Sequence, residues 1–467
     1  MAKVTVGIPQ GTRDFSPGIV RKRNYILNTI RNVFELYGFQ PLETPAMENL
    51  DTLMGKYGEE GDKLIFRILN NGLDKPEKEK QAREDFEKLL QGKNVKGITE
   101  RALKYDLTIP FARYVAMNHN QLTFPFKRYQ VQPVWRADKA QRGRYREFYQ
   151  CDADVVGSTS LLNEVELATI YTTVFEKLNV DVEIKINSRK ILTALAEICG
   201  GADKMTNITV AIDKLDKIGL DKVKIELGQR GLNEDQIAII EKYLSISGSN
   251  EEKLKQVKEL IGDNSVGKAG IHELETILYY QLPGSTVSSG RAESRINNLA
   301  IDFTLARGLN YYTGTIFEVK AKNVDMGSIG GGGRYDDLTG LFGVPNIPGV
   351  GISFGVDRIY DVMEELKLFP EEVYIGTQVL FFNLGDQESK AAFAILQQLR
   401  EKGVRGELYH ENSKFDKQFK YAEKKQIPFV VIIGEEELKS NTCKLKDLRS
   451  GQQQSLSTQE LVNTTFE

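Results

Sequence analysis

The chain has 467 residues, of which 40% are hydrophobic and 27% are charged, and this composition excludes a wholly disordered, collagenous or coiled-coil protein. The 62 lysines and arginines nearly balance the 65 aspartates and glutamates, so nucleic-acid binding would have to use local basic patches. At about 150 residues per domain, the length predicts roughly three domains.

Cysteine and histidine usage limits the chemistry. The three cysteines, Cys151, Cys199 and Cys443, lie far apart without a CxxC motif, which predicts a reducing compartment. The three histidines form no HExxH motif and no cluster with cysteine, so no His/Cys metal site is expected, whereas a Mg²⁺ site made of carboxylate and phosphate remains open. No apolar run approaches about 18 residues and no signal-peptide core is present, so we expect a soluble, cytoplasmic protein.

The first hundred residues predict a helix, a short strand and an insertion. Apolar residues recur at helical spacing from Pro17 onward, and Gly38 supplies the end of the helix. Residues 39–45 are typical of a short strand that proline terminates. Residues 70–100 are rich in glycine, lysine and glutamate, and they predict a surface insertion with a helix over 82–90.

The middle of the chain combines strands with a helical segment. Two β-rich runs, 127–135 and 148–156, flank a polar connection and predict an antiparallel pair. An amphipathic helix is expected over 161–178. Short helices rich in Lys, Glu and Asp follow over 200–291, and this pattern predicts an inserted helical subdomain. Strands resume at 299–305 and 315–321, before four consecutive glycines.

After residue 371 strands and helices alternate. Strands are expected over 379–383, 407–410 and 428–433, and helices over 388–402 and 413–425. This alternation predicts a small α/β domain with a largely parallel sheet.

A basic segment lies between the two paired strands. It contains seven basic residues and a single acid, Asp138, within residues 127–146: Lys127, Arg128, Arg136, Lys139, Arg142, Arg144 and Arg146. Arginine suits phosphate because its planar guanidinium donates two parallel hydrogen bonds and stays charged. The segment therefore either binds an anionic partner or forms a solvated basic hairpin, and its composition leaves both readings open.

The glycine run at 330–333, followed by Arg334 and Tyr335, is a second candidate site. A glycine run lets the backbone approach a ligand closely, although such clusters more often form turns. It is not a P-loop, and residues 349–355 lack the spacing of a dinucleotide-binding motif. Arg358 follows three residues after Gly355, at the expected start of a helix.

Together these motifs resemble class II aminoacyl-tRNA synthetases, and specifically the histidyl-tRNA synthetase family, over essentially the whole chain. The first class II motif resembles the helix ending at Gly38 with the strand to Pro45, which forms the dimer interface in the family. The second resembles residues 126–136 together with 144–150. The third resembles residues 349–358.

Two further motifs are selective for the histidine family: Ala306-Arg-Gly-Leu-Asn-Tyr-Tyr-Thr313 and Gly331-Gly-Gly-Arg-Tyr-Asp-Asp337. The resemblance implies an α+β class II synthetase catalytic core, with an antiparallel sheet and an inserted helical subdomain, followed by a C-terminal α/β anticodon-binding domain. The implied domains are the first part of the core at 1–200, the helical insertion at 201–290, the second part of the core at 291–370, and the anticodon-binding domain at 371–467.

The resemblance also implies roles in ATP binding and activation. The substrate carboxylate attacks the α-phosphorus of ATP directly, so the enzyme supplies alignment and positive charge. Arg136 would hold the α-phosphate, and Arg144 and Arg358 the γ-phosphate. The remaining implied residues are Phe148 and Asp138 at the adenine, and Arg307 beside the α-phosphate, where other class II enzymes use a metal ion.

A histidine pocket is implied by the same resemblance. Neutral imidazole offers one donor and one acceptor, so a selective pocket needs a partner for each. Asp106 and Tyr312 match the family's positions for this task. The other implied histidine-binding residues are Gln150 and Asp154 at the α-amino group with Thr108 nearby, Tyr311 and Tyr335 as walls, and Arg307.

The implied activity joins L-histidine to tRNA(His) through a histidyl-adenylate, releasing AMP and pyrophosphate, by a homodimer that uses Mg²⁺ with ATP. One alternative is a paralogue that binds histidine and regulates ATP phosphoribosyltransferase without charging tRNA. The arginines at 136, 307 and 358 and the C-terminal domain argue against it. A second alternative, a class II ligase for another amino acid, conflicts with Asp106, Arg307 and Tyr312.

Some residues depart from the family pattern. Asp138 stands where class II enzymes usually have glutamate, and Asn310 replaces a common aspartate. In the C-terminal domain, which should read the anticodon, four lysines share one face of the helix expected over 413–425: Lys414, Lys417, Lys420 and Lys424. Such a face either contacts RNA phosphates or is simply solvated.

Overall fold

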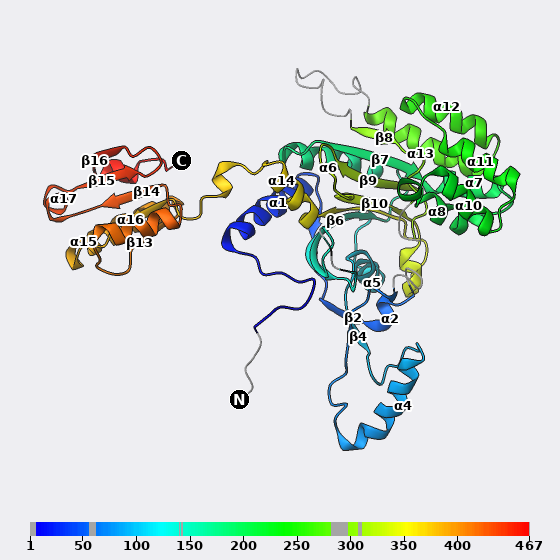
Figure 1. Cartoon of the computed structure of the whole chain (residues 1–467), viewed down its shortest axis with the longest axis horizontal. Helices are drawn as coiled ribbons and strands as arrows, with labels where there is room; N and C mark the ends of the chain where they lie inside the picture. The colour runs from blue at the N-terminus through cyan, green and yellow to red at the C-terminus, as the bar shows by residue number, and fades with distance from the viewer. Residues whose placement is uncertain are drawn as a thin grey trace. The chain divides into compact units, whose positions relative to one another are not determined.

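The computed structural model describes residues 6–55, 62–139, 141, 143–281, 298–306 and 311–466 (Figure 1). The chain divides into two compact units, Met1–Asp14 with Ile26–Leu368, and Phe15–Tyr25 with Phe369–Glu467. Among the described residues, no helix is long and apolar enough to cross a membrane.

An eight-stranded sheet forms the centre of the first unit. Its strands are, in spatial order, β1 (Gln40–Pro41), β5 (Phe126–Trp135), β6 (Glu147–Val156), β11 (Gly349–Gly355), β10 (Gly330–Tyr335), β9 (Thr315–Ala321), β7 (Val182–Ser188) and β8 (Leu299–Ile301). The predicted antiparallel pairing of residues 127–135 with 148–156 is confirmed by β5 and β6. Only the two end pairs, β1 with β5 and β7 with β8, are parallel.

The first predicted strand is shorter than expected. Helix α1 (Pro17–Leu36) ends as predicted near Gly38. The φ of Gly38 is 77°, a conformation that glycine adopts without strain. Strand β1 that follows has two residues instead of the seven expected over 39–45. Because Pro41 and Pro45 have no backbone N–H, they cannot donate to a sheet ladder.

Aromatic side chains pack the helices onto one face of the sheet. Phe354 of β11 lies 5.8 Å from Phe34 of α1, 4.8 Å from Tyr171 and 5.6 Å from Phe175, between ring centroids. The two latter residues belong to α6 (Leu162–Lys177), which lies along this face (Figure 1). Each such buried ring stabilises the fold by about 1.5–3 kcal/mol. The helices thus occupy one face and leave polar side chains to the other.

The glycine run is a strand. Residues 330–333 begin β10, which pairs with β9 and β11 on its two sides. Glycine suits the position because a Cβ at Gly330 would lie 2.7 Å from the ring of Tyr171. The Tyr171 hydroxyl also donates to the carbonyl oxygens of Gly331 and Ser353, at 2.8 and 3.1 Å. The run therefore does not form a turn, although glycine clusters more often do, and Gly330 allows α6 to pack closely on the sheet.

A small second sheet and a helix cover part of the polar face. The sheet has the order β2 (Met47–Asn49), β4 (Arg101–Leu103), β3 (Arg67–Ile68), and it packs with α2 (Leu50–Leu53) and α5 (Thr108–Asn118). The insertion carries η1 (Pro76–Lys78) and α4 (Glu79–Leu90) (Figure 1). The helix expected over 82–90 is therefore confirmed and begins three residues earlier.

Helices connect β7 to β8, as the pattern over 200–291 predicts. They are α7 (Arg189–Ile198), η2 (Ala202–Lys204), α8 (Met205–Ile212), α9 (Leu215–Ile218), α10 (Leu220–Gln229), α11 (Glu234–Leu244), α12 (Asn250–Ile261) and α13 (Ser265–Gln281). Capping boxes start α11 at Asn233 and α12 at Ser249. The remainder of that range, including Pro283 and Gly284, lies outside the described residues.

The second unit is a five-stranded sheet with helices on both faces. The strand order is β13 (Gly406–Leu408), β12 (Val379–Phe381), β14 (Phe429–Ile432), β15 (Thr442–Asp447), β16 (Gln453–Ser457). One face packs against α15 (Asp386–Glu401) and α18 (Thr458–Val462), and the other against α16 (Phe415–Lys424). Two covered faces explain why the central strands are continuous apolar runs.

The prediction of a largely parallel C-terminal sheet was only half right. The first three strands in the order are parallel, whereas β14 with β15 and β15 with β16 are antiparallel. Only α17 (Glu435–Ser440) and short turns join β14 to β15. A parallel crossover requires about a dozen connecting residues or more, so the chain returns in the opposite direction.

Candidate active site

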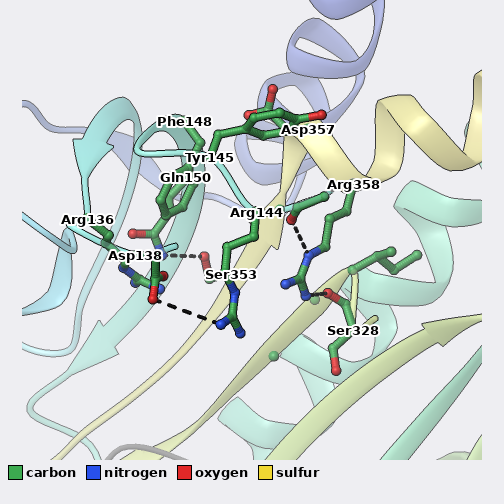
Figure 2. Close-up of a pocket in the computed structure, with 15 residues that line it drawn as sticks. Arg136, Asp138, Arg144, Tyr145, Phe148, Gln150, Ser328, Ser353, Asp357 and Arg358 are labelled. Carbon is green, nitrogen blue, oxygen red and sulfur yellow. Dashed lines mark hydrogen bonds and ion pairs between the residues drawn. The ribbon is translucent and has the colours of Figure 1, made fainter. Parts of the chain in front are cut away.

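A cavity of about 310 Å³ opens on the polar face of the large sheet (Figure 2). We call it the arginine cavity; its charged and aromatic lining includes Arg136, Asp138, Arg144, Phe148 and Arg358. All five are residues for which the sequence predicts ATP contacts. The structure therefore brings together every predicted ATP-binding residue except Arg307, which lies outside the described residues together with Asn310 and Arg142.

The connection between β5 and β6 supplies three of these residues. Arg136 Nε donates to the carbonyl oxygen of Tyr105 at 2.8 Å, and its guanidinium carbon lies 5.2 Å from the ring centroid of Phe148. Arg144 Nη1 lies 3.9 Å from Asp138 Oδ1, too far for a strong ion pair. The protein therefore orients the guanidinium of Arg136, whereas the guanidinium of Arg144 can still form ion pairs and hydrogen bonds with another anion.

Arg358 enters the cavity from the first turn of α14 (Val356–Glu365), as Figure 2 shows. Its Nε donates to the carbonyl oxygen of Gly143 at 2.8 Å and its Nη1 to that of Ser328 at 2.6 Å. Burial, together with the nearby cations Arg144 and Arg136, lowers the pKa of Arg358. Three arginines that repel one another in one cavity make a site for a polyanion such as a triphosphate.

The segment before α1 braces this cavity, which the sequence analysis missed. The Arg13 guanidinium carbon lies 3.3 Å from the ring centroid of Tyr145, and the same side chain forms an ion pair with Asp357 of α14. The backbone N–H of Arg146 donates to the carbonyl oxygen of Gly11 at 2.9 Å. No spacing rule links residues so far apart in sequence, so only the structure reveals this contact.

A row of polar side chains leads away from the arginine cavity along β6. Gln150, Asp152 and Asp154 alternate with apolar residues, so they lie on one face of the strand, and we call them the polar row. Opposite them in β11 stand Gly355, Ser353 and Gly351. A Cβ at Gly351 would lie 2.0 Å from Asp154 Oδ1, so glycine is required for the aspartate to fit.

We expect Gly351→Ala to destabilise the first unit by about 1–3 kcal/mol, because the added methyl group must displace the buried Asp154 carboxylate. Urea unfolding followed by intrinsic fluorescence measures this. The matched control is Gly228→Ala in α10, where the nearest atom to a new Cβ is 3.8 Å away and alanine favours the helix. Equal effects of the two substitutions would contradict the close approach at Gly351.

Asp154 is held by a buried cation and a tyrosine. Its Oδ2 lies 2.8 Å from Arg128 Nη2, and its Oδ1 accepts a hydrogen bond from the Tyr335 hydroxyl at 2.6 Å. The side chain of Arg128 is fully buried, and its guanidinium carbon lies 4.0 Å from the ring centroid of Phe111. In the sequence Arg128 is only one member of the basic segment, and its burial is not expected because basic residues rarely lie in a core.

Asp106 and three tyrosines form a cluster at the end of the polar row, where the sequence predicts a histidine pocket. Ring centroids of Tyr311 and Tyr312 are 4.8 Å apart, and those of Tyr311 and Tyr335 are 5.9 Å apart. Asp106 Oδ1 accepts from the backbone N–H of Ile109 at 3.3 Å, at the start of α5. We call these four residues, Asp106, Tyr311, Tyr312 and Tyr335, the tyrosine pocket.

Thr108 joins the tyrosine pocket through a hydrogen bond with Tyr311. Burial raises the pKa of Asp106 to about 7, although the nearby Arg136 acts in the opposite direction. The structure therefore assembles all the described residues of the predicted histidine site. Asp152 and Ser353 belong to the same assembly, and the sequence analysis did not single them out.

The raised pKa of Asp106 predicts a pH dependence of stability. A carboxyl that holds its proton more tightly in the folded state stabilises the protein below pH 4, and this stabilisation is lost between pH 4 and about 7. For one such group the loss is on the order of 4 kcal/mol. Urea unfolding at several pH values from 5 to 8 should show that the free energy of unfolding declines more steeply with pH for the wild type than for Asp106→Asn. Parallel curves would contradict the prediction.

Arg334, a further candidate, lies on the other face of the sheet. Its guanidinium pairs with Glu164 of α6, with Nη2 2.7 Å from Oε2, and donates to the carbonyl oxygens of Ser158 and Ser160 at 3.2 and 3.3 Å. Both side chains of the pair are at most 4% exposed. This arginine is therefore part of the core and not a ligand-binding residue.

The antiparallel sheet, the arginine cavity and the buried acidic and tyrosine side chains beside it define a catalytic core of the class II aminoacyl-tRNA synthetase type. The histidyl-tRNA synthetase family model matches residues 79–359, and the anticodon binding domain model matches residues 378–465. The chain belongs to the histidyl-tRNA synthetase family.

Individual relatives agree over the full length. A protein of Bacteroides fragilis named "Histidine--tRNA ligase" is 54% identical over 465 residues, covering 98% of both chains, and one of Flavobacterium johnsoniae is 51% identical over 474 residues. The crystal structure of histidyl-tRNA synthetase from Nostoc sp. PCC 7120 has a TM-score of 0.81 at 33% identity, covering 99% of both chains. A Bacillus halodurans structure described as an ATP phosphoribosyltransferase regulatory subunit/histidyl-tRNA synthetase shares the fold at 18% identity.

Proposed function

We propose that this enzyme is a histidine–tRNA ligase, which activates L-histidine with ATP and transfers the histidyl group to tRNA(His). One observation carries the proposal: the polar row runs from a cavity with three arginines to a cluster of one acid and three tyrosine side chains. A triphosphate and an imidazole would thus meet along one strand. The regulatory alternative is not favoured, because full-length relatives above 50% identity are named as ligases.

Activation requires charge stabilisation and no nucleophile from the protein. The histidine carboxylate attacks the α-phosphorus, and negative charge grows on the phosphate oxygens as pyrophosphate leaves. We assign Arg136 to the α-phosphate because the protein already orients its guanidinium. Arg144 and Arg358 hold the γ-phosphate end. Arg307, which lies outside the described residues, is assigned to the α-phosphate on the family resemblance.

The adenine and the imidazole are recognised by planar and polar groups. Phe148 offers its ring to the adenine, and Asp138 accepts from the adenine amino group. In the tyrosine pocket, the Asp106 carboxylate accepts from one imidazole nitrogen and the Tyr312 hydroxyl donates to the other. Tyr311 and Tyr335 enclose the ring, and Thr108 and the polar row, with Gln150 and Asp154, receive the α-amino group.

The remaining partners follow from the reaction. Within the described residues, no cluster of three or more His, Cys, Asp or Glu side chains could hold a metal ion. The arginine-rich lining fits phosphate, so we propose that Mg²⁺ arrives with ATP on its phosphate oxygens. The C-terminal unit would bind the anticodon, with lysines of α16 near RNA phosphates. We further propose a cytoplasmic homodimer with a dimer interface built on the first class II motif.

The decisive experiment is ATP–pyrophosphate exchange with each of the twenty amino acids in turn. Exchange with histidine alone is the expected result, because imidazole offers a donor to Asp106 and an acceptor to Tyr312 on one flat ring that the tyrosines enclose. Transfer to tRNA(His) is then measured with labelled histidine. Histidine binding without any exchange would refute the ligase function and favour a regulatory protein.

A further inference from the structure

The N-terminal segment of residues 10–13 packs against the connection between β5 and β6. The backbone N–H of Arg146 donates to the carbonyl oxygen of Gly11 at 2.9 Å, and its Nη1 donates to that of Gln10 at 3.4 Å. Arg146 Nε also donates to the carbonyl oxygen of Asp138 at 3.1 Å. A Cβ at Gly11 would lie 2.7 Å from Cγ of Arg146, and the φ of Gly11 is 85°, so glycine is required at this crossing. The segment is thus fixed to the connection.

Arg13, at the end of this segment, contacts two residues of the arginine cavity. Its guanidinium carbon lies 3.3 Å from the ring centroid of Tyr145, and its Nη2 forms an ion pair with Asp357 in the first turn of α14. The Asp357 side chain is 6% exposed, and its Oδ2 accepts from the backbone N–H of Tyr149 in β6 at 3.4 Å. Tyr145 and Asp357 both line the cavity (Figure 2), and Arg13 stands behind them without lining it. One guanidinium therefore joins the connection to α14.

The residues next to these two contacts are the arginines assigned to the γ-phosphate. Arg144 precedes Tyr145, and Arg358 follows Asp357. The Nε of Arg358 donates to the carbonyl oxygen of Gly143 at 2.8 Å, so α14 and the connection also meet inside the cavity. Both arginines carry positive charge and repel each other, so the backbone that carries them must hold them together. Their separation depends on how the connection is fixed against α14.

We propose that Arg13 is a positioning residue for ATP, which holds Arg144 and Arg358 at the separation that the γ-phosphate end requires. The inference rests on the proposed function and adds to it a residue outside the three class II motifs. Arginine suits the position because its planar guanidinium stacks on the ring of Tyr145 while it pairs with the carboxylate of Asp357.

The α-phosphate and the amino acid should not depend on Arg13. Arg136 is oriented by the carbonyl oxygen of Tyr105, and the tyrosine pocket is built from other parts of the first unit. Ligands that reach the γ-phosphate end should therefore bind less tightly when Arg13 is removed, and ligands that lack the outer phosphates should bind as before.

Pyrophosphate exchange separates this role from a general loss of stability. ATP and pyrophosphate carry the outer phosphates, AMP keeps only the adenosine and the α-phosphate, and histidine has no phosphate. Exchange gives kcat and the KM for ATP, pyrophosphate and histidine, and competition with ATP gives the inhibition constant of AMP. The enzymes are the wild type, Arg13→Ala, Arg13→Lys and the control Arg230→Ala, each checked by its melting temperature. The control removes an ion pair in α10 whose arginine is 30% exposed, against 28% for Arg13.

We expect Arg13→Ala to raise the KM for ATP and for pyrophosphate about tenfold, the effect of losing about one hydrogen bond to a charged group. The kcat, the KM for histidine and the inhibition constant of AMP should stay within about threefold of wild type. Arg13→Lys keeps the charge beside Asp357 without the planar stacking, so it should fold and show the same selectivity with about a threefold effect. Arg230→Ala should change none of these constants.

Asp357→Asn and the double variant with Arg13→Ala test how Arg13 acts. If it acts through α14, the KM for ATP in the double variant should fall well short of the product of the two single effects. Effects that multiply, or equal losses for ATP and AMP in Arg13→Ala and Arg13→Lys, would overturn the inference. Wild-type enzyme without histidine-dependent exchange would instead refute the proposed function.

Discussion

Arg136→Ala should reduce the kcat of histidine-dependent ATP–pyrophosphate exchange by about 10³-fold, the upper range for loss of one oriented donor to a developing oxyanion. The guanidinium is already oriented by its hydrogen bond to the carbonyl oxygen of Tyr105 and by the ring of Phe148. It therefore needs little reorganisation when charge develops on the α-phosphate. The KM for ATP should rise less than about tenfold, because Arg144 and Arg358 still bind the other end of the triphosphate.

Arg136→Lys is the informative control. Lysine keeps the charge but cannot donate two parallel hydrogen bonds or span from the Tyr105 carbonyl to a phosphate, so it should restore only a small part of the rate. Both variants should fold, since a single hydrogen bond contributes about 1 kcal/mol. A rise in the KM for ATP with unchanged kcat would show that Arg136 binds ATP without stabilising the transition state.

The regular elements and the arginines that line the cavity could be predicted from the sequence because both leave local signals. Alternating and helical spacings marked β5, β6 and α6 within one or two residues of their observed ends. The arginines at 136, 144 and 358 occur in motifs with fixed spacing, and all three line one cavity. Signals of this kind depend on neighbours in the chain.

The antiparallel pairing of β5 with β6 was predicted, but the side chains that face each other across the two strands could not be. Arg128 looked like part of a basic surface, and only the register of β5 against β6 places it opposite Asp154. Asp152 gave no signal of its own, since one acid among ordinary strand residues says nothing about what faces it.

The glycine run illustrates how composition misleads. Four glycines usually indicate a turn, because glycine weakens a strand interior. Here they lie in the middle of the sheet, where side chains would collide with Tyr171 on one face and with the backbone or with Tyr312 on the other. For Gly330 the reason is the ring of Tyr171, which is distant in sequence, so no rule based on neighbouring residues predicts it.

Glu164→Gln should lower the free energy of unfolding of the first unit by about 3 kcal/mol, because it leaves the buried cation of Arg334 with only the half-exposed Asp336, 3.6 Å away, as a carboxylate partner. The two side chains are 0% and 4% exposed, and the pair clamps α6 to β10 directly behind the tyrosine pocket. Glutamine keeps the size and can still accept a hydrogen bond, so the loss reports mainly the charge. Urea unfolding at pH 7 measures it.

The double variant Glu164→Leu with Arg334→Met tests the same account from the opposite side. Removing both charges eliminates the uncompensated cation, and apolar side chains of similar length fill the space, so much of the lost stability should return. The carbonyl oxygens of Ser158 and Ser160 would lose their donor, which sets a cost of about 1–3 kcal/mol for each if they stay buried. A double variant that is less stable than either single change would show that these carbonyl contacts, and not the ion pair, hold the helix to the sheet.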